Sequence, residues 1–139
     1  MREVHRVRFQ DLLSRKLRTF PAVVLLGPRQ SGKSSLATAV PARGARHAFD
    51  LERPSDLARL RLAPEEDLGT LQTSPGLIVI DEIQREPSLF PLLRPLLDAP
   101  SRRARYLLLG SASPALVAGA SESLAGRVGF VDLTPFLAR

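Results

Sequence analysis

The feature that most constrains this chain is the octapeptide GPRQSGKS at residues 27–34, which follows the apolar run 22–26. It fits the Walker A pattern G-x-x-x-x-G-K-[ST], whose glycines allow a tight loop with backbone N–H groups turned toward phosphate oxygens. In this pattern Lys33 reaches the β and γ phosphates, and the hydroxyl of Ser34 ligates magnesium. The helix that begins near Gly32 points its positive end at the same anion. The octapeptide therefore predicts a nucleoside triphosphate site.

The expected nucleotide contacts extend from the loop into the first turn of the helix after it. They are Gly27, Pro28, Arg29, Gln30, Ser31, Gly32, Lys33, Ser34 and Ser35. ATP is expected in preference to GTP, because the chain has no guanine-specifying N-K-x-D motif. ATP and Mg²⁺ are the expected cofactors.

A second motif, of Walker B type, is the segment GLIVIDE, which ends in two carboxylates, Asp81 and Glu82. The apolar residues before them are typical of a buried parallel strand whose carboxyl end faces a ligand crevice. We expect Asp81 to hold Mg²⁺ through a water molecule, and Glu82 to orient or deprotonate an attacking water. A small-molecule kinase needs no water-activating carboxylate beside its magnesium carboxylate, so the pair favours ATP hydrolysis.

The composition suits one domain with a single core. The chain has 139 residues, of which 44% are hydrophobic, and it lacks cysteine, which excludes disulfides and thiolate metal sites. Neither histidine has a partner at metal-ligand spacing. The N-terminal residues are charged and lack the apolar core of a signal peptide, and no apolar run is long enough to cross a bilayer. These features predict a cytoplasmic protein without a membrane partner.

The formal net charge is +6, carried by 18 arginines and 2 lysines, so polyanions are plausible partners. The densest basic stretches are short and lie at 15–18 and 102–105. Neither is interleaved with the aromatic residues that stack on single-stranded bases. A solvated loop is the favoured interpretation of 102–105, and a nucleic-acid contact is the alternative that stays open.

Apolar periodicity and turn residues predict alternating helices and strands. An N-terminal helix is expected over 3–18, with a packing side formed by Val4, Val7, Leu12, Leu13 and Leu17. Strands are expected at about 22–26, 45–51, 77–81, 106–109 and 128–133. Further helices are expected at 34–40, 54–62 with Ser55 as cap, 64–68, 89–97 with Ser88 as cap, 114–118 and 121–125. This alternation predicts an α/β fold with a parallel sheet covered on both faces.

Four motifs in order resemble a family of prokaryotic AAA-like ATPases: GPRQSGKS, LIVIDEIQ with Pro87 after it, LLLGSAS, and SLAGRV before a strand that ends in Leu-Thr-Pro. The match runs from about residue 16 to residue 136. The resemblance implies a single ATPase domain over 1–139, with 1–20 as a helical lead-in. Family members usually carry a second domain that looks related to restriction-endonuclease-like folds. That domain would begin where this chain stops, at Arg139.

The resemblance also implies a P-loop NTPase three-layer sandwich with a sheet order of 5-1-4-3-2. The strand before Gly110 would then lie between the phosphate-loop strand and the carboxylate strand. Ser111 would be the polar sensor that faces the γ-phosphate, although spacing alone favours an ordinary turn residue. Gln84 matches the family motif without a role that we can assign.

Arg127 lies in SLAGRV and has two competing interpretations. From the residue alone, we favour an arginine at the end of a short helix that pairs with helix carbonyls or a nearby carboxylate. The AGR triplet matches the family motif, however, and no other motif arginine is available to balance charge on the γ-phosphoryl group. The resemblance therefore suggests an arginine finger that acts in trans within a homo-oligomer.

ATP hydrolysis is the leading function, and two alternatives remain. The first is a regulatory module that binds nucleotide without turnover, in which ATP stabilises one conformation. The second is a small-molecule kinase, which needs an arginine-bearing lid. Arg59 and Arg61 lie in the right region for such a lid but match no lid pattern.

Overall fold

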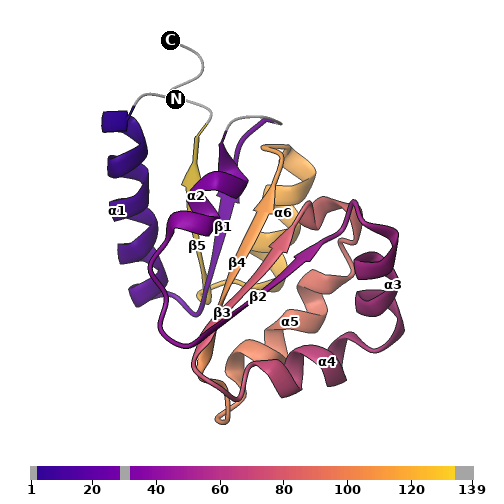
Figure 1. Ribbon diagram of the computed structural model, residues 1–139. Helices are drawn as coiled ribbons and strands as arrows, with labels where there is room; N and C mark the ends of the chain where they lie inside the picture. The colour runs from indigo at the N-terminus through magenta and orange to yellow at the C-terminus, as the bar shows by residue number, and fades with distance from the viewer. Residues whose placement is uncertain (1–2, 29–31, 134–139) are drawn as a thin grey trace.

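A twisted parallel sheet lies between two helical layers (Figure 1). The computed structural model describes residues 3–28 and 32–133. The strands are β1 (Ala22–Leu26), β2 (Ala45–Asp50), β3 (Gly76–Asp81), β4 (Ala104–Gly110) and β5 (Val128–Asp132). Their order is β2-β3-β4-β1-β5, which confirms the expected order 5-1-4-3-2 read from the other side.

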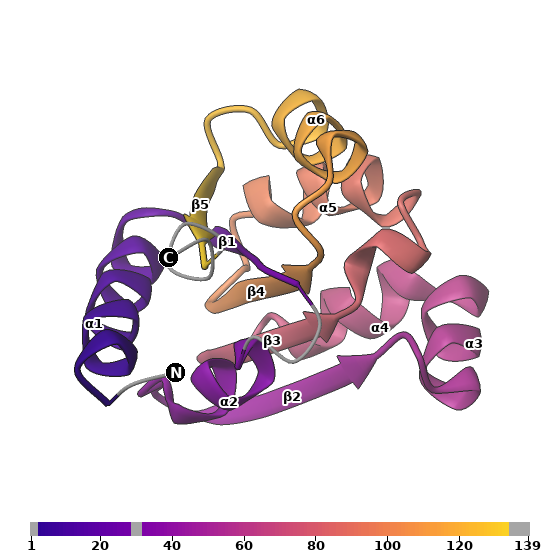
Figure 2. The ribbon, with the colours of Figure 1, turned by 90° about the horizontal axis from the view of Figure 1, so that it is seen from above.

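The helices divide between the two faces of this sheet (Figure 2). They are α1 (Glu3–Thr19), α2 (Lys33–Ala39), α3 (Pro54–Leu62), α4 (Pro64–Leu71), α5 (Leu89–Asp98) and α6 (Pro114–Ser123), with a short 3₁₀ turn, η1 (Ile83–Arg85), after β3. α1 and α2 cover one face, and α3 to α6 cover the other. The α/β prediction is therefore confirmed.

Each central strand is buried on both faces, because alternate residues point to opposite helical layers. In β1, Val24 packs with the α5 and α6 side, whereas Val23 and Leu25 pack with α1 and α2. All five residues of this strand are buried. A strand of this kind reads as a continuous apolar run, which explains why residues 22–26 and 77–80 were recognisable from the sequence.

The packing side of α1 agrees with the expected one at Leu12, Leu13 and Leu17 but not at Val7. Phe9, Leu13 and Leu17 are buried against the sheet, whereas Val7 is 57% exposed. The spacing of four between the buried residues places them on one stripe of the helix, and Val7 lies off that stripe. The side chain of Val4 is outside the described residues.

Two helix caps and the bounds of two helices were predicted wrongly. The helix expected at 64–68 is α4, which ends at Leu71. Ser55 lies inside the first turn of α3, since Arg53 precedes the helix without a side-chain cap bond. Ser88 precedes α5, but its hydroxyl donates to Glu86 at 2.5 Å instead of capping the helix. Residues 114–123 form one helix where two were expected; Ser113 caps it by accepting a bond from the Leu116 N–H at 3.2 Å.

Because every strand pair is parallel, the carboxyl ends of all five strands meet at one edge of the sheet. This is the upper edge in Figure 1, where the chain leaves β1 toward α2. The amino ends of the strands form the opposite edge, together with the C-terminal end of α1.

Candidate functional site

The phosphate-loop motif lies between the carboxyl end of β1 and the first turn of α2. Its first residue is fixed to the neighbouring strand, since the Gly27 N–H donates to the Gly110 carbonyl at 3.1 Å. Gly32 precedes α2 and has a φ of 89°, a left-handed backbone conformation that residues other than glycine rarely adopt. This backbone conformation explains why the motif has a glycine at position 32. Arg29, Gln30 and Ser31 lie outside the described residues.

Lys33 is the first residue of α2, and its side chain turns back toward the start of the motif. Its Nζ donates to the carbonyl oxygens of Gly27 at 2.6 Å and Pro28 at 3.0 Å. The residue is only 6% exposed. A buried ammonium is costly unless hydrogen bonds satisfy its donors, and these two carbonyls serve that purpose. The charge is thereby held at the carboxyl edge of the sheet.

Ser34 and Asp81 meet in space although they come from different elements. The Ser34 hydroxyl donates to Asp81 Oδ2 at 2.9 Å, which joins α2 to the last residue of β3. A hydroxyl oxygen beside a carboxylate oxygen is a donor set of the hard type that Mg²⁺ prefers. Within residues 3–28 and 32–133, no three His, Cys, Asp or Glu side chains gather into a metal cage. The set suits Mg²⁺ completed by water and phosphate oxygens, as is usual for this ion.

Glu82 adopts an unusual backbone conformation at the end of β3. Its φ is 60° and its ψ is 46°, and it is the only residue other than glycine with a positive φ within the described chain. Such a conformation costs of the order of 1–3 kcal/mol and is retained where the surroundings require it. The turn η1 follows immediately, and it brings Gln84 back beside Glu82. Gln84 Nε2 donates to Glu82 Oε1 at 2.7 Å.

Gln84 also lies close to Gly110 of β4, where any side chain in place of glycine would have to displace neighbouring side-chain ends. A Cβ added to Gly110 would lie 2.5 Å from Leu116 Cδ1 and 2.8 Å from Gln84 Oε1. That oxygen is buried and has no hydrogen-bond partner in the described part of the chain. Gln84 thus lies between β4 and the carboxylate of Glu82. This position could not be predicted from the sequence motif.

Ser111 follows β4 directly, one residue beyond Gly110. Gly110 is in register with Leu26 of β1, so Ser111 is placed beside the start of the phosphate-loop motif. It is partly exposed. Its position at the same edge as Lys33 and Asp81 agrees with the place expected for a sensor, and the role itself remains a prediction.

These side chains surround a cavity of about 420 Å³, whose size is within the usual range of small-molecule sites. It is lined by Gly32, Lys33, Ser34, Ser35, Asp50, Glu52, Asp81 and Glu82. Asp50 and Glu52 were not predicted as site residues from the sequence. Asp50 ends β2 in register with Asp81, so the pairing of strand 45–51 with strand 77–81 was the signal that could have found it. A second cavity, of about 340 Å³, adjoins through Ser34, Asp50 and Asp81.

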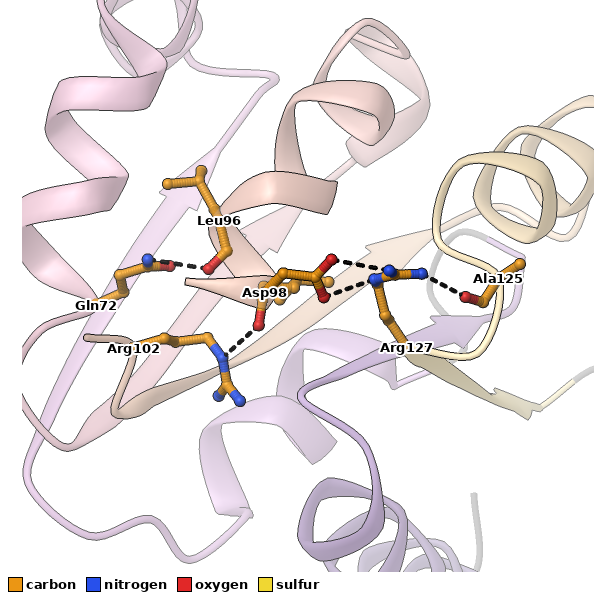
Figure 3. Close-up of polar contacts among 7 residues, drawn as sticks. Gln72, Leu96, Asp98, Arg102, Ala125 and Arg127 are labelled. Carbon is orange, nitrogen blue, oxygen red and sulfur yellow. Dashed lines mark hydrogen bonds and ion pairs between the residues drawn. The ribbon is translucent and has the colours of Figure 1, made fainter. Parts of the chain in front are cut away.

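Arg127 lies away from this cavity, at the amino edge of the sheet, just before β5. Its Nε and Nη2 donate to the two carboxylate oxygens of Asp98 at 2.7 and 2.8 Å, and its Nη1 donates to the Ala125 carbonyl at 2.8 Å (Figure 3). The hydrogen bond from Arg127 lowers the pKa of the Asp98 carboxyl. The structure therefore does not bring Arg127 to the other candidate residues of its own chain, and it gives the arginine the carboxylate and carbonyl partners of the simpler interpretation.

The arginines considered for a kinase lid have other contacts. Arg59 lies over the ring of Phe49, 5.0 Å from its centroid, and Arg61 pairs with Glu86 at 2.6 Å. These contacts do not favour the kinase alternative. Among the described residues, no helix combines the length and apolar character needed to cross a bilayer.

The curated relatives are mycobacterial proteins of uncharacterised function. The chain is 49% identical over 127 residues to the uncharacterized protein Mb2031c of Mycobacterium bovis and, to the same extent, to the uncharacterized protein Rv2008c of Mycobacterium tuberculosis. In both comparisons, 91% of this chain is matched but only 28% of the relative. The chain thus spans little more than a quarter of the length of these relatives.

Among solved structures, the Walker-type ATPase PABY2304 of Pyrococcus abyssi has a similar fold. The TM-score is 0.63 at 17% identity, and the match covers 92% of this chain and 53% of that one. This likeness supports a P-loop ATPase fold. In addition, the family model described as an AAA domain matches residues 19–139, most of the chain. Together with the phosphate-loop and carboxylate motifs at one edge of the sheet, this match shows that the chain belongs to the AAA domain family.

Proposed function

We propose that this domain binds ATP together with Mg²⁺ and hydrolyses it to ADP and phosphate. The observation that carries the proposal is the contact of Ser34 with Asp81 at 2.9 Å, with Glu82 next in the chain and facing the same cavity. A hydroxyl, a magnesium carboxylate and a second carboxylate at one edge are the parts that a P-loop hydrolase needs. Membership of the AAA domain family supports the nucleotide.

Binding depends on the charge that α2 brings to this edge. Lys33 would exchange its loop carbonyls for β- and γ-phosphate oxygens, and the backbone N–H groups of the loop would surround the same phosphates. Ser34 and Asp81 would hold Mg²⁺. When bound, this ion neutralises charge on the β and γ phosphates during transfer.

Glu82 is the group we assign to water activation. Its carboxylate would accept a proton as the water oxygen bonds to the γ-phosphorus and the bond from that phosphorus to the β–γ bridging oxygen breaks. ADP carries away the electron pair of the broken bond. Gln84 restricts the carboxylate by donating to one of its oxygens, which leaves the other free of that bond for water.

The test separates binding from chemistry. Glu82→Gln keeps the shape of the side chain but removes the base, so ATP affinity should persist while phosphate release falls roughly 10²- to 10⁴-fold. Glu65→Gln, a change at an exposed position of α4, is the matched control and should leave both unchanged. Unchanged phosphate release in Glu82→Gln would remove Glu82 from this role. ATP binding without turnover in the parent chain would favour the regulatory module instead.

A further inference from the structure

The amino edge of the sheet carries a cavity of about 530 Å³, opposite to the candidate ATP site. Four segments that are far apart in the sequence line it, and their backbones lie toward the lower edge of the sheet in Figure 1. They are the end of α1, the loop after α2, the start of β3 and the start of β4, contributing Ser14, Leu17, Arg18, Pro41, Ala42, Arg43, Pro75, Gly76, Leu77, Arg103 and Arg105. α2 links the two sites directly, because it begins at Lys33 and is followed by the loop that lines this cavity.

The charge of this cavity lining is entirely positive. Four of the lining residues are arginines, and none is Asp or Glu. Arg18, Arg43 and Arg103 are exposed, and none of them forms an ion pair with another described residue. Arg105 is anchored by a bond from its Nη1 to the Phe20 carbonyl at 2.9 Å. The fold therefore joins the two basic stretches that are separate in the sequence, 15–18 and 102–105, and adds Arg43 between them.

The neighbouring Arg102 also indicates that the electrostatic potential around the cavity is positive. Arg102 is next to the cavity in sequence, and its pKa is lowered by burial and, in second place, by the charge of Arg105. The guanidinium of Arg102 is held on the Leu97 and Ala104 carbonyls at 3.0 and 2.8 Å. An anion bound at this edge would relieve the repulsion between these arginines.

The kind of anion follows from what else lines the cavity. A guanidinium group can donate two hydrogen bonds to the oxygens of one phosphate. Every nucleotide of a nucleic acid carries a phosphate, so such contacts do not depend on the base sequence. No aromatic side chain lines the cavity for base stacking, and the two leucines are buried, at 7% and 2% exposure. The exposed apolar residues of the lining are Pro41, Ala42 and Pro75, and none of them is an aromatic or Met side chain of the kind enriched in protein–protein interfaces.

We propose that the arginines of this cavity bind the phosphate backbone of a nucleic acid without reading its sequence. The exposed Arg18, Arg43 and Arg103 would contact successive phosphates, and the net charge of +6 would steer the polyanion toward the domain. This site is separate from the proposed ATP site, and its test does not depend on hydrolysis.

The experiment measures fluorescence anisotropy of a short labelled DNA duplex, the matching single strand and an RNA of the same sequence, titrated with the chain at several salt concentrations. The variant Arg18→Gln/Arg103→Gln removes two charges from the cavity. Arg8→Gln/Arg94→Gln, the matched control, removes two from exposed positions of α1 and α5 outside it. Thermal unfolding verifies that both variants remain folded.

The cavity variant should bind at least about tenfold more weakly at low salt, and the slope of log K against log salt should decrease by roughly one to two, whereas the control keeps the parent affinity. Equal losses in both variants would overturn the site, because dispersed charge would then explain binding. Absence of binding to all three nucleic acids at low salt would overturn it too. So would binding of a poly-glutamate peptide in place of nucleic acid, which indicates an acidic protein partner.

Discussion

The Ser34 hydroxyl donates to Asp81 Oδ2 across 2.9 Å, between residues that are 47 positions apart in the chain. Ser34 follows β1 through the phosphate-loop motif, and Asp81 ends β3, but β4 lies between these two strands in the sheet. The contact therefore depends on the order of the strands, since α2 must reach across the end of β4 to place the hydroxyl. This relationship makes the pair the most direct test of the candidate magnesium site.

Asp81→Asn should weaken the magnesium-dependent part of ATP binding. The amide still accepts a hydrogen bond from Ser34 but no longer carries the negative charge that attracts the cation. Charge-assisted contacts contribute about 1.5–3 kcal/mol each, so affinity in the presence of Mg²⁺ should fall roughly 10- to 100-fold. Calorimetric titration with and without Mg²⁺ measures this, and Asp67→Asn on α4 is the control. Equal affinity of Asp81→Asn and the parent with Mg²⁺ would remove Asp81 from the site.

Lys33→Ala should abolish tight ATP binding, since it removes the ammonium that the motif directs at the β and γ phosphates. The expected loss corresponds to one or more charge-assisted contacts, about 1.5–3 kcal/mol each. Titration calorimetry with ATP and Mg²⁺ is the measurement. Lys16→Ala is a close control, because Lys16 is the other lysine of the chain and lies over the Phe20 ring, 5.8 Å from its centroid. If Lys33→Ala and Lys16→Ala bind ATP equally, the assignment of Lys33 fails.

The two ATP-site motifs were predictable because each is local. A strand buried on both faces reads as an apolar run, and the loop glycines and carboxylates follow it directly, as at 22–34 and 76–82. The resemblance to AAA-like ATPases supplied the strand order, which periodicity does not encode. Segments of 8–10 residues with a weak apolar pattern, such as 114–123, gave less reliable boundaries.

What the sequence did not reveal depends on strand pairing. Asp50 ends a weak, mostly exposed strand, and only its register beside Asp81 places it at the cavity. Arg18 and Arg103 belong to short basic stretches that have little meaning separately, and α1 and β4 bring them to one cavity. The contact of Gln84 with Glu82 accompanies a positive φ at Glu82, which no residue preference for glutamate would suggest.

Gln84 is expected to act as a positioning residue for Glu82. Gln84→Met keeps the length of the side chain but removes the donor, so the carboxylate gains freedom and kcat should fall roughly 10- to 100-fold with KM nearly unchanged. Gln84→Glu places a second carboxylate beside Glu82, so the acid limb of the kcat profile should move to higher pH. Steady-state phosphate release across pH measures both. A purely structural glutamine would change neither the pH profile nor kcat of the folded fraction.

The pair of Asp98 and Arg127 should contribute to stability only where Asp98 is ionised. Its pKa is lowered in the folded state by the hydrogen bond from Arg127, so the contribution is fully present above the unfolded pKa of about 4 and is lost as the pH falls through the folded pKa. Asp98→Asn should therefore lower the melting temperature slightly at neutral pH and match the parent in acid. Asp67→Asn is the control, and a difference that grows on acidification would contradict the assignment.

The contact of Arg127 with Asp98 also bears on the hypothesis that Arg127 is an arginine finger. Arg127 precedes β5, whereas the candidate ATP site lies at the other end of the strands, roughly 15 Å away along a five-residue strand. Arg127 is therefore not placed to reach the γ-phosphate of its own chain, and only a neighbouring subunit can use it. Its side chain would also have to leave Asp98, to which it donates two bonds.

If Arg127 acts in trans, Arg127→Ala should lower turnover by roughly 10³- to 10⁵-fold while ATP affinity is retained. Mixing these chains with Glu82→Gln chains should restore part of the activity, because each supplies the residue that the other lacks. Asp98→Ala separates the two roles: it removes the ion pair but keeps the arginine, so it should lower the melting temperature without lowering turnover. Full hydrolysis by Arg127→Ala alone would leave the arginine with a structural role beside Asp98, and an inactive mixture would exclude the trans geometry alone.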